Sequence, residues 1–144
     1  MNKTILITGA TSGIGKATAE LLASLGFRLI LAGRRKDRLV ELKDNLRHLA
    51  KIHILNFDVR DKDAISKLIA GLPKDFREID VLINNAGNAY GMGPIHEGEL
   101  DDWDNMIDIN LKGLLYVTRA ISPQMVERKS GHIINIGSLA GVET

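Results

Sequence analysis

A glycine-rich run, Thr8-Gly9-Ala10-Thr11-Ser12-Gly13-Ile14-Gly15, separates an apolar, strand-like stretch from a helix-like one. A glycine-rich turn from strand to helix can hold a nucleotide pyrophosphate on its backbone amides and on the positive end of the helix. Gly9 is expected to make the tight turn, Gly13 to let the backbone approach a phosphate, and Gly15 to let helix pack on strand. Glycines at this density also occur in ordinary loops that bind no ligand. The run therefore predicts a nucleotide site only in combination with further motifs.

The composition excludes several classes of protein. A chain of 144 residues matches one domain, and 19 basic against 18 acidic residues favour neither a nucleic acid nor an anionic membrane as partner. There is no cysteine for a disulfide or a thiolate metal site, and the four histidines show no metal-ligand spacing. The first apolar run ends at Gly9, which is too short for a signal peptide or a membrane span. We therefore expect a cytoplasmic protein.

Strand-like and helix-like patterns alternate along the whole chain. Strands are expected at 3–8, 27–32, 52–57, 79–84 and 133–136, and helices at 13–25, 36–49, 61–70 and 101–129. The last helix is open to an interruption near Gly113 or Pro123. Repeated strand–helix–strand units with right-handed crossovers give a parallel sheet covered on both faces. The expected fold is α/β, a doubly wound Rossmann-type domain over 1–144 that stops after the fifth strand, with strand order 3-2-1-4-5.

Helical spacing also predicts which residues are buried. In the first helix, capped by Ser12 and Gly26, the expected core face is Ile14, Ala17, Leu21 and Leu25. In the second helix it is Leu39, Leu42, Leu46 and Leu49. In the long helical stretch it is Trp103, Met106, Ile107 and Leu111. A further apolar face, with Leu114, Val117 and Ile121, fits burial against the chain's own sheet or against a partner equally well.

Chemically suggestive residues come directly after the expected strands, and ligands of open α/β sheets bind beyond the carboxyl ends of strands. They are Gly9, Arg34, Asp58-Val59, Asn84-Asn85-Ala86-Gly87 and Gly137-Ser138. Each has a plain alternative as a turn residue or a helix cap, and Asn110 could simply satisfy a neighbouring backbone group. Together they outline one crevice.

The residues after the second expected strand bear on the choice of coenzyme. NAD sites usually place a carboxylate there for the ribose 2′-hydroxyl, whereas this chain has Arg34 and Arg35, with no carboxylate before Asp37. A guanidinium fork suits the 2′-phosphate of NADP, and a charge-assisted hydrogen bond contributes about 1.5–3 kcal/mol. The prediction is NADP over NAD, with Arg34 as main contact and Arg35 as second. The alternative is a solvated basic turn.

These motifs, in this order, resemble the first part of a short-chain dehydrogenase/reductase over essentially the whole chain. The matching segments are Thr8-Gly9-x-x-x-Gly13-x-Gly15, Asp58-Val59, Asn84-Asn85-Ala86-Gly87, Ile109-Asn110-Leu111-Lys112-Gly113 and Ile134-Asn135-Ile136-Gly137-Ser138. The resemblance implies cofactor-binding roles for Gly9, Thr11, Ser12, Gly13, Ile14, Gly15, Arg34, Arg35, Asp58, Val59, Asn85, Ala86 and Gly87.

The resemblance also implies individual roles. Asp58 would hydrogen-bond the adenine amino group beside the Val59 backbone, and Asn84 and Ala86 would support the adenosine ribose and hold the fourth strand. The two catalytic positions are Asn110, which would anchor a proton-relay water, and Ser138, which would orient the substrate carbonyl. Tyr90, Met92 and His96 lie in the loop that often lines the family's substrate pocket. The sequence favours neither a role in that pocket nor a position outside it.

The family transfers a hydride between nicotinamide and a carbinol or carbonyl carbon, with a tyrosine moving the proton and a lysine four residues later lowering its pKa. Here Tyr90 is followed at that spacing by Pro94, and Tyr116 by Ala120. The family places the pair beyond the serine that Ser138 matches. We therefore expect the chain to be the N-terminal portion of a longer single-domain enzyme, able to bind coenzyme without turnover by itself.

Finer features resemble one subgroup, the NADP-dependent 3-hydroxy acid dehydrogenases that oxidise serine and related acids. They are Gly33-Arg34-Arg35, 88–92, Asp102-Trp103 and 125–128. The subgroup implies a small-molecule substrate and a homo-oligomer, a tetramer in the intact enzyme. The nearest alternative enzyme is a 3-oxoacyl carrier-protein reductase or another small-carbonyl reductase. Alternatives of other classes are a non-catalytic NADP-binding module and a purely structural domain.

Overall fold

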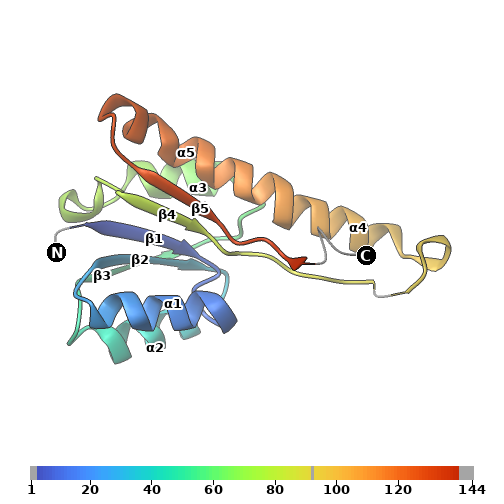
Figure 1. Cartoon of the computed structure of the whole chain (residues 1–144), viewed down its shortest axis with the longest axis horizontal. Helices are drawn as coiled ribbons and strands as arrows, with labels where there is room; N and C mark the ends of the chain where they lie inside the picture. The colour runs from blue at the N-terminus through green and yellow to red at the C-terminus, as the bar shows by residue number, and fades with distance from the viewer. Residues whose placement is uncertain (1–2, 92, 140–144) are drawn as a thin grey trace.

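The computed structural model describes residues 3–91 and 93–139, and its centre is one parallel sheet (Figure 1). The strands are β1 (Thr4–Thr8), β2 (Arg28–Gly33), β3 (Ile52–Asn56), β4 (Val81–Asn84) and β5 (His132–Asn135). Their order is β3-β2-β1-β4-β5, which confirms the predicted doubly wound arrangement. Each strand begins and ends within two residues of its expected bounds.

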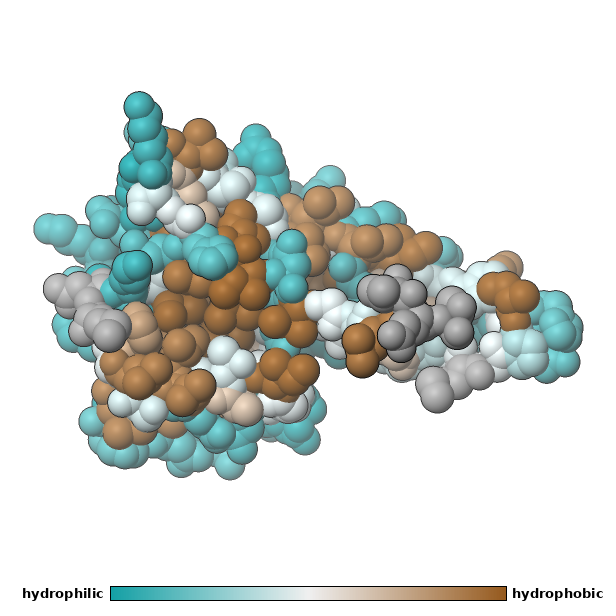
Figure 2. Space-filling view, viewed as in Figure 1, coloured by the Kyte–Doolittle hydropathy of each residue, from teal (hydrophilic) through white to brown (hydrophobic). Residues whose placement is uncertain are grey.

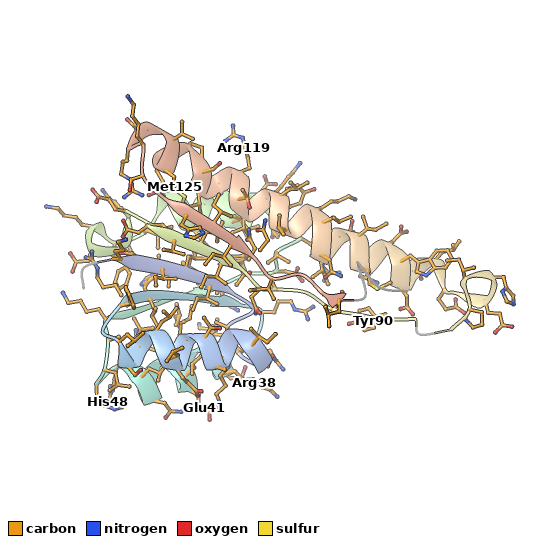
Figure 3. All side chains as sticks on the ribbon, viewed as in Figure 1. Arg38, Glu41, His48, Tyr90, Arg119 and Met125 are labelled. Carbon is orange, nitrogen blue, oxygen red and sulfur yellow. The ribbon has the colours of Figure 1, made fainter. Side chains whose placement is uncertain are left out.

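Helices cover the sheet on both faces. They are α1 (Gly13–Ser24), α2 (Lys36–Leu46), α3 (Lys62–Ala70), α4 (Leu100–Ile107) and α5 (Leu114–Glu127), with a π-helical turn at Asp108–Gly113 and short 3-10 turns at Lys74–Phe76 and Ile95–Glu97. α1 and α2 pack on one face of the sheet, whereas α3 and α5 pack on the other. α2 ends at Leu46, so Leu49 lies beyond the helix and is exposed, unlike its prediction. Arg38 and Glu41 of α2, and His48 just beyond its end, lie on the side away from the sheet (Figure 3).

The core explains why these strands form. Successive side chains of a strand point to opposite faces, and both faces of the central strands are covered. On β1, Leu6 packs toward the α3–α5 side, whereas Ile5 and Ile7 pack toward the α1–α2 side. All five residues of β1 are buried, as expected for the middle strand of a doubly wound sheet.

The predicted core face of α1 is wrong. Its buried residues are Gly15, Ala19 and Ala23, whereas Ile14, Leu21 and Leu25 are each more than half exposed. A Cβ on Gly15 would overlap the carbonyl oxygen of Gly9, so the missing side chain lets the helix lie directly on the turn that precedes it. This close contact fixes the rotation of α1 and turns its small residues, one helical turn apart, toward the sheet.

The other end of α1 closes as expected. Gly26 has a φ of 77°, its N–H donates to the carbonyl of Ala23, and the Phe27 N–H donates to that of Leu22. This pair of bonds is a Schellman motif, which needs a left-handed residue directly after the cap. Ser12 occupies the N-cap position, but its side chain makes no capping bond.

The long helical stretch runs through Pro123 but is altered at the π-helical turn that ends at Gly113, so the first of the two suggested interruptions is confirmed. A π-helical turn contains one more residue than an α-helical turn, so apolar spacing cannot be followed across it. The prediction that Ile107 and Leu111 face the core is accordingly wrong, because both are exposed. Val117 and Ile121 are fully buried against the chain's own sheet, which decides between the two alternatives for this face.

Candidate functional site

A cavity of about 790 Å³ lies at the carboxyl ends of the strands. This is the position at which open α/β sheets bind ligands, and its volume falls in the range of small-molecule sites. Every residue predicted to bind the coenzyme or to act in catalysis lines this cavity except Gly15, which lies against Gly9. The structure therefore brings together residues that span the chain from the first strand to beyond the fifth.

The glycine turn has the conformation that the sequence predicted. Gly9 and Gly13 have φ values of 64° and 52°, which only glycine adopts without strain. A Cβ on Gly9 would lie 2.9 Å from the Cα of Ala86, whereas a Cβ on Gly13 would meet nothing within 4 Å. Gly13 therefore presents bare backbone to the cavity, next to an α1 first turn that carries no acidic residue. This donor set fits a dinucleotide pyrophosphate.

Thr8 joins the glycine turn to the segment after β4. Its buried hydroxyl accepts hydrogen bonds from the backbone N–H groups of Asn85 and Ala86, each at 3.0 Å. The side-chain amide of Asn85 donates back to the carbonyl oxygens of Thr8 and Gly9, at 3.0 and 3.2 Å. Two segments of the cavity wall that are remote in sequence are thus fixed to each other.

The two arginines after β2 point to different partners. The Nη2 of Arg35 donates to the hydroxyls of Thr11 and Ser12, at 3.0 and 3.2 Å. Arg34 lies 3.9 Å from a carboxylate oxygen of Asp58 and its side chain is 59% exposed. The side chain of Asn56, at the end of β3, donates to the carbonyls of Gly33 and Arg34 and so holds the backbone of this basic turn.

Asp58, after β3, is held by Arg60. The Nε and Nη2 of Arg60 donate to the two carboxylate oxygens at 3.1 and 2.7 Å, and the Arg60 backbone N–H donates to Oδ1 at 3.0 Å. These hydrogen bonds lower the pKa of Asp58, against the opposing effect of its burial. The neighbouring Val59 is buried beneath Gly113, where a Cβ would lie 2.6 Å from the valine Cγ2.

Asn110 lies in the π-helical turn and fixes the loop after β4. Its Oδ1 accepts from the backbone N–H of Asn88 at 2.9 Å, and its Nδ2 donates to the Asn88 carbonyl at 2.8 Å. Its side-chain amide thus satisfies backbone groups, which is the plain alternative that the sequence left open for Asn110. Both polar side-chain atoms of Asn88 are buried without a hydrogen-bond partner, at the wall of the cavity.

Ser138 lines the far side of the cavity, beyond β5, together with Asn135 and Gly137. Asn84 fixes this side from below, because its Nδ2 donates to Thr118 Oγ1 at 2.9 Å and to Asn135 Oδ1 at 3.0 Å. The buried Asn84 therefore holds β4 to β5 and to α5, which agrees with the strand-holding role predicted for it.

The loop residues suggested for a substrate pocket lie elsewhere or are not described. Tyr90 is 47% exposed and His96 pairs with Glu97 at the surface, and neither lines the cavity. Met92 lies outside the described residues. Within 3–91 and 93–139, no group of three or more His, Asp or Glu side chains could hold a metal ion, and no helix is long and apolar enough to cross a membrane.

Sequence reasoning missed Thr8, Asn56 and Arg60 as residues that shape the site. Thr8 directly precedes Gly9 and Arg60 follows Asp58 by two positions, so their places in the motifs offered a signal. Asn56 offered no signal beyond its place at the end of a strand, because its partners are backbone carbonyls at the end of β2 and directly after it.

The chain is similar to several known proteins. NADP-dependent 3-hydroxy acid dehydrogenase YdfG of Escherichia coli (strain K12) is 50% identical over 137 residues, which are 95% of this chain and 54% of that protein. The crystal structure of serine dehydrogenase from Escherichia coli has a TM-score of 0.92 at 48% identity, covering 98% of this chain and 64% of the other. The closed form of serine dehydrogenase complexed with NADP+ has a TM-score of 0.90 at 50% identity, with 96% and 55% covered.

The chain spans about half the length of the curated relatives it matches. A family model described as short chain dehydrogenase matches residues 3–144, nearly the whole sequence. The glycine turn, the residues beyond β3 and β4 and the serine beyond β5 therefore lie on a shared scaffold, and this chain belongs to the short-chain dehydrogenase family.

Proposed function

We propose that this chain forms the coenzyme-binding part of an NADP-dependent oxidoreductase that acts on a small 3-hydroxy acid such as serine. The observation that carries the proposal is the cavity in which the open backbone of Gly13 and the two arginines after β2 face one space. Bound NADP would supply or accept the hydride. The residues of this chain would bind and orient it.

The pyrophosphate would lie against the glycine turn. The turn offers backbone N–H groups at the amino end of α1, where the partial positive charge of the helix favours an anion. Gly13 leaves open the space that a side chain would fill. Thr11, Ser12 and Ile14 line the same part of the cavity, as their proposed contact with the coenzyme requires.

The 2′-phosphate of NADP would lie between the basic turn and the glycine turn. Arg35 already reaches the hydroxyls of Thr11 and Ser12, so a phosphate there could accept bonds from a guanidinium and two hydroxyls. Arg34 could leave its loose contact with Asp58 to provide the second guanidinium. We therefore assign Arg35 a share of the 2′-phosphate at least equal to that of Arg34.

At the adenine end, Asp58 would accept a hydrogen bond from the 6-amino group beside Val59. At the reaction end, Ser138 would orient the substrate carbonyl and Asn110 would anchor a proton-relay water, whereas Ala86 would support the adenosine ribose. All of these residues line the cavity. The tyrosine and lysine that move the proton in this family are not provided by Tyr90 or Tyr116, since neither has a lysine four residues later.

The proposed substrate class rests on the relatives. Those named for 3-hydroxy acids and for serine, together with sulfoacetaldehyde reductase 2 of Chromohalobacter salexigens, are 46–50% identical to this chain, whereas a 3-oxoacyl-[acyl-carrier protein] reductase structure from Brucella melitensis is 30% identical. A homo-oligomer is part of the proposal. Its support is the exposure of three large apolar side chains along the long helix, Ile107, Leu111 and Leu115.

Titration of the chain with NADP and NAD tests the proposal. One charge-assisted hydrogen bond corresponds to roughly a tenfold to hundredfold preference for NADP, and Arg35→Ala should remove most of it while leaving NAD binding unchanged. Arg47→Ala, at an exposed arginine on the far end of α2, is the matched control. Equal affinity for both coenzymes would contradict the assignment. Hydride transfer catalysed by the chain alone would contradict the expectation that it binds the coenzyme without turnover.

A further inference from the structure

Arg60 touches two parts of the molecule that are far apart in sequence. Its Nε and Nη2 bind the carboxylate of Asp58, whereas its Nη1 donates to the Oδ1 of Asn105 on α4 at 2.9 Å. Asn105 is itself oriented, because its Nδ2 donates to the carbonyl of Asp101 at 2.8 Å. The guanidinium plane is therefore fixed from both sides, and with it the plane of the Asp58 carboxylate.

The hydrogen bonds leave Asp58 with one oxygen that is only partly used. Oδ1 accepts from both the backbone N–H and the Nε of Arg60, which occupies its two lone pairs. Among the residues that the structure describes, Oδ2 accepts one hydrogen bond, from Nη2, and the Nη1 of Arg34 lies 3.9 Å from it. Arg34 is the looser of the two cations, so it can leave while Arg60 keeps the carboxylate charged and in place.

We propose that Arg60 is a positioning residue, which holds Asp58 so that one lone pair of Oδ2 meets the 6-amino group of the coenzyme's adenine. This inference rests on the proposed coenzyme function and adds a residue to it. Arg60 does not touch the coenzyme. It makes the site select a purine that carries a hydrogen-bond donor at position 6, because a carboxylate held in this orientation repels an oxygen there.

Two dinucleotides test the selection, and they differ at position 6 of the purine and in the proton that the 6-oxo base carries on N1. The chain is titrated with NADP and with its 6-oxo analogue, nicotinamide hypoxanthine dinucleotide phosphate. The unaltered chain should prefer NADP roughly tenfold or more, the value of one charge-assisted hydrogen bond. Arg60→Met, which keeps an apolar stem of similar reach, should bring the two affinities to within about twofold, and Arg60→Lys should lie between because a single ammonium cannot replace the fork. Arg47→Met should leave the ratio unchanged.

The ratio of the two affinities separates a positioning role from general damage to the fold, because a loosened fold weakens the binding of both dinucleotides equally. A chain that binds neither dinucleotide would overturn the proposed function itself. A chain that prefers NADP, with an unchanged ratio in Arg60→Met, would overturn the role of Arg60 alone.

A second measurement needs no ligand. The carboxyl carbon of Asp58 is followed by NMR as the pH is lowered, in the unaltered chain and in two variants. Arg60→Met should raise the titration midpoint toward the ordinary aspartate value, and Arg34→Met should move it less. The opposite order would assign the positioning role to Arg34 and overturn the proposal.

Discussion

The two halves of the sheet are built from similar residues but are covered to different extents. In the half formed by β3, β2 and β1, the interior residues of β2 and every residue of β1 are buried. In the half formed by β4 and β5, Ile134 is 36% exposed and Ile136, just after β5, is 39% exposed. Figure 2 shows hydrophobic surface in the middle of the view, where Figure 1 draws the strands in front.

The difference arises on one face only. Ile133 packs into the core on the α3–α5 side, whereas Ile134 pairs with Ile83 in register and points to the α1–α2 side. On that side the buried cluster is built from α1, α2 and the strands β1 to β4, and β5 contributes no member to it among the described residues. The comparison teaches that Asp58 follows a strand of the covered half, whereas Ser138 extends from a strand that is covered on one face.

The largest expected effect contrasts one isoleucine from each half. Ile30→Ala on β2 removes a fully buried side chain and should lower the free energy of unfolding by about 2–5 kcal/mol. Ile134→Ala on β5 removes a side chain that keeps a third of its exposure and should cost less than about 1 kcal/mol. Urea unfolding followed by circular dichroism measures both. Equal losses of unfolding free energy in the two variants would contradict the difference in burial between the two halves of the sheet.

The next prediction separates ligand binding from stability within the covered half. Gly13 and Gly26 both have positive φ, and a Cβ on either would meet nothing within 4 Å. Alanine at either position should therefore cost a similar, roughly 1–2 kcal/mol, because of left-handed strain. Only Gly13→Ala should also weaken NADP binding, by tenfold or more, because only Gly13 lines the cavity. Titration calorimetry and unfolding of both variants check this, and a loss of binding in Gly26→Ala would contradict it.

A smaller effect on stability but a clear one on association is expected at β5. Exposed apolar surface beside a strand edge invites contact between molecules. The double variant Ile134→Thr/Ile136→Thr should leave unfolding within about 1 kcal/mol of the unaltered chain and should reduce concentration-dependent self-association in analytical ultracentrifugation. Val40→Thr on α2, a 40% exposed position of the covered half, is the control. A monodisperse, monomeric unaltered chain would refute the prediction.

The smallest expected effect is a pH dependence that belongs to the covered half. The folded pKa of Asp58 is lowered from 3.8 by Arg60, so its contribution to stability is present above that pH and is lost as the pH falls through the folded value. The stability difference between the unaltered chain and Asp58→Asn should therefore be constant near neutral pH and shrink below about pH 4. Unfolding at a series of pH values measures it. A difference that grows on acidification would have the wrong sign.

The sequence predicted the strands well because buried parallel strands are continuous apolar runs, and it predicted that the candidate site residues lie together because the strand ends share one edge of the sheet. It failed where orientation depends on contacts between distant residues. The rotation of α1 is decided by the contact of Gly15 with Gly9, which outweighs the apolar spacing of Ile14 and Leu21.

The same limit explains the site residues that were missed or given an additional partner. Arg60 and Asn105 are 45 positions apart, and Asn110 is 22 positions from Asn88, so the pairings depend on how the loops meet the long helix. The π-helical turn, in which Asn110 lies, has no signature in apolar spacing, and it shifts the rotation of every helical residue after it.

The single hydroxyl of Thr8 has a consequence for the kinetics of ligand entry. The backbone N–H groups of Asn85 and Ala86, directly after β4, both donate to the hydroxyl oxygen of Thr8 on β1. This part of the cavity wall therefore loses its conformational entropy during folding and not during binding. A ligand then meets walls that already have their final spacing. Association should accordingly be a single bimolecular step whose observed rate rises linearly with coenzyme concentration, and Thr8→Val should add a slower, concentration-independent phase.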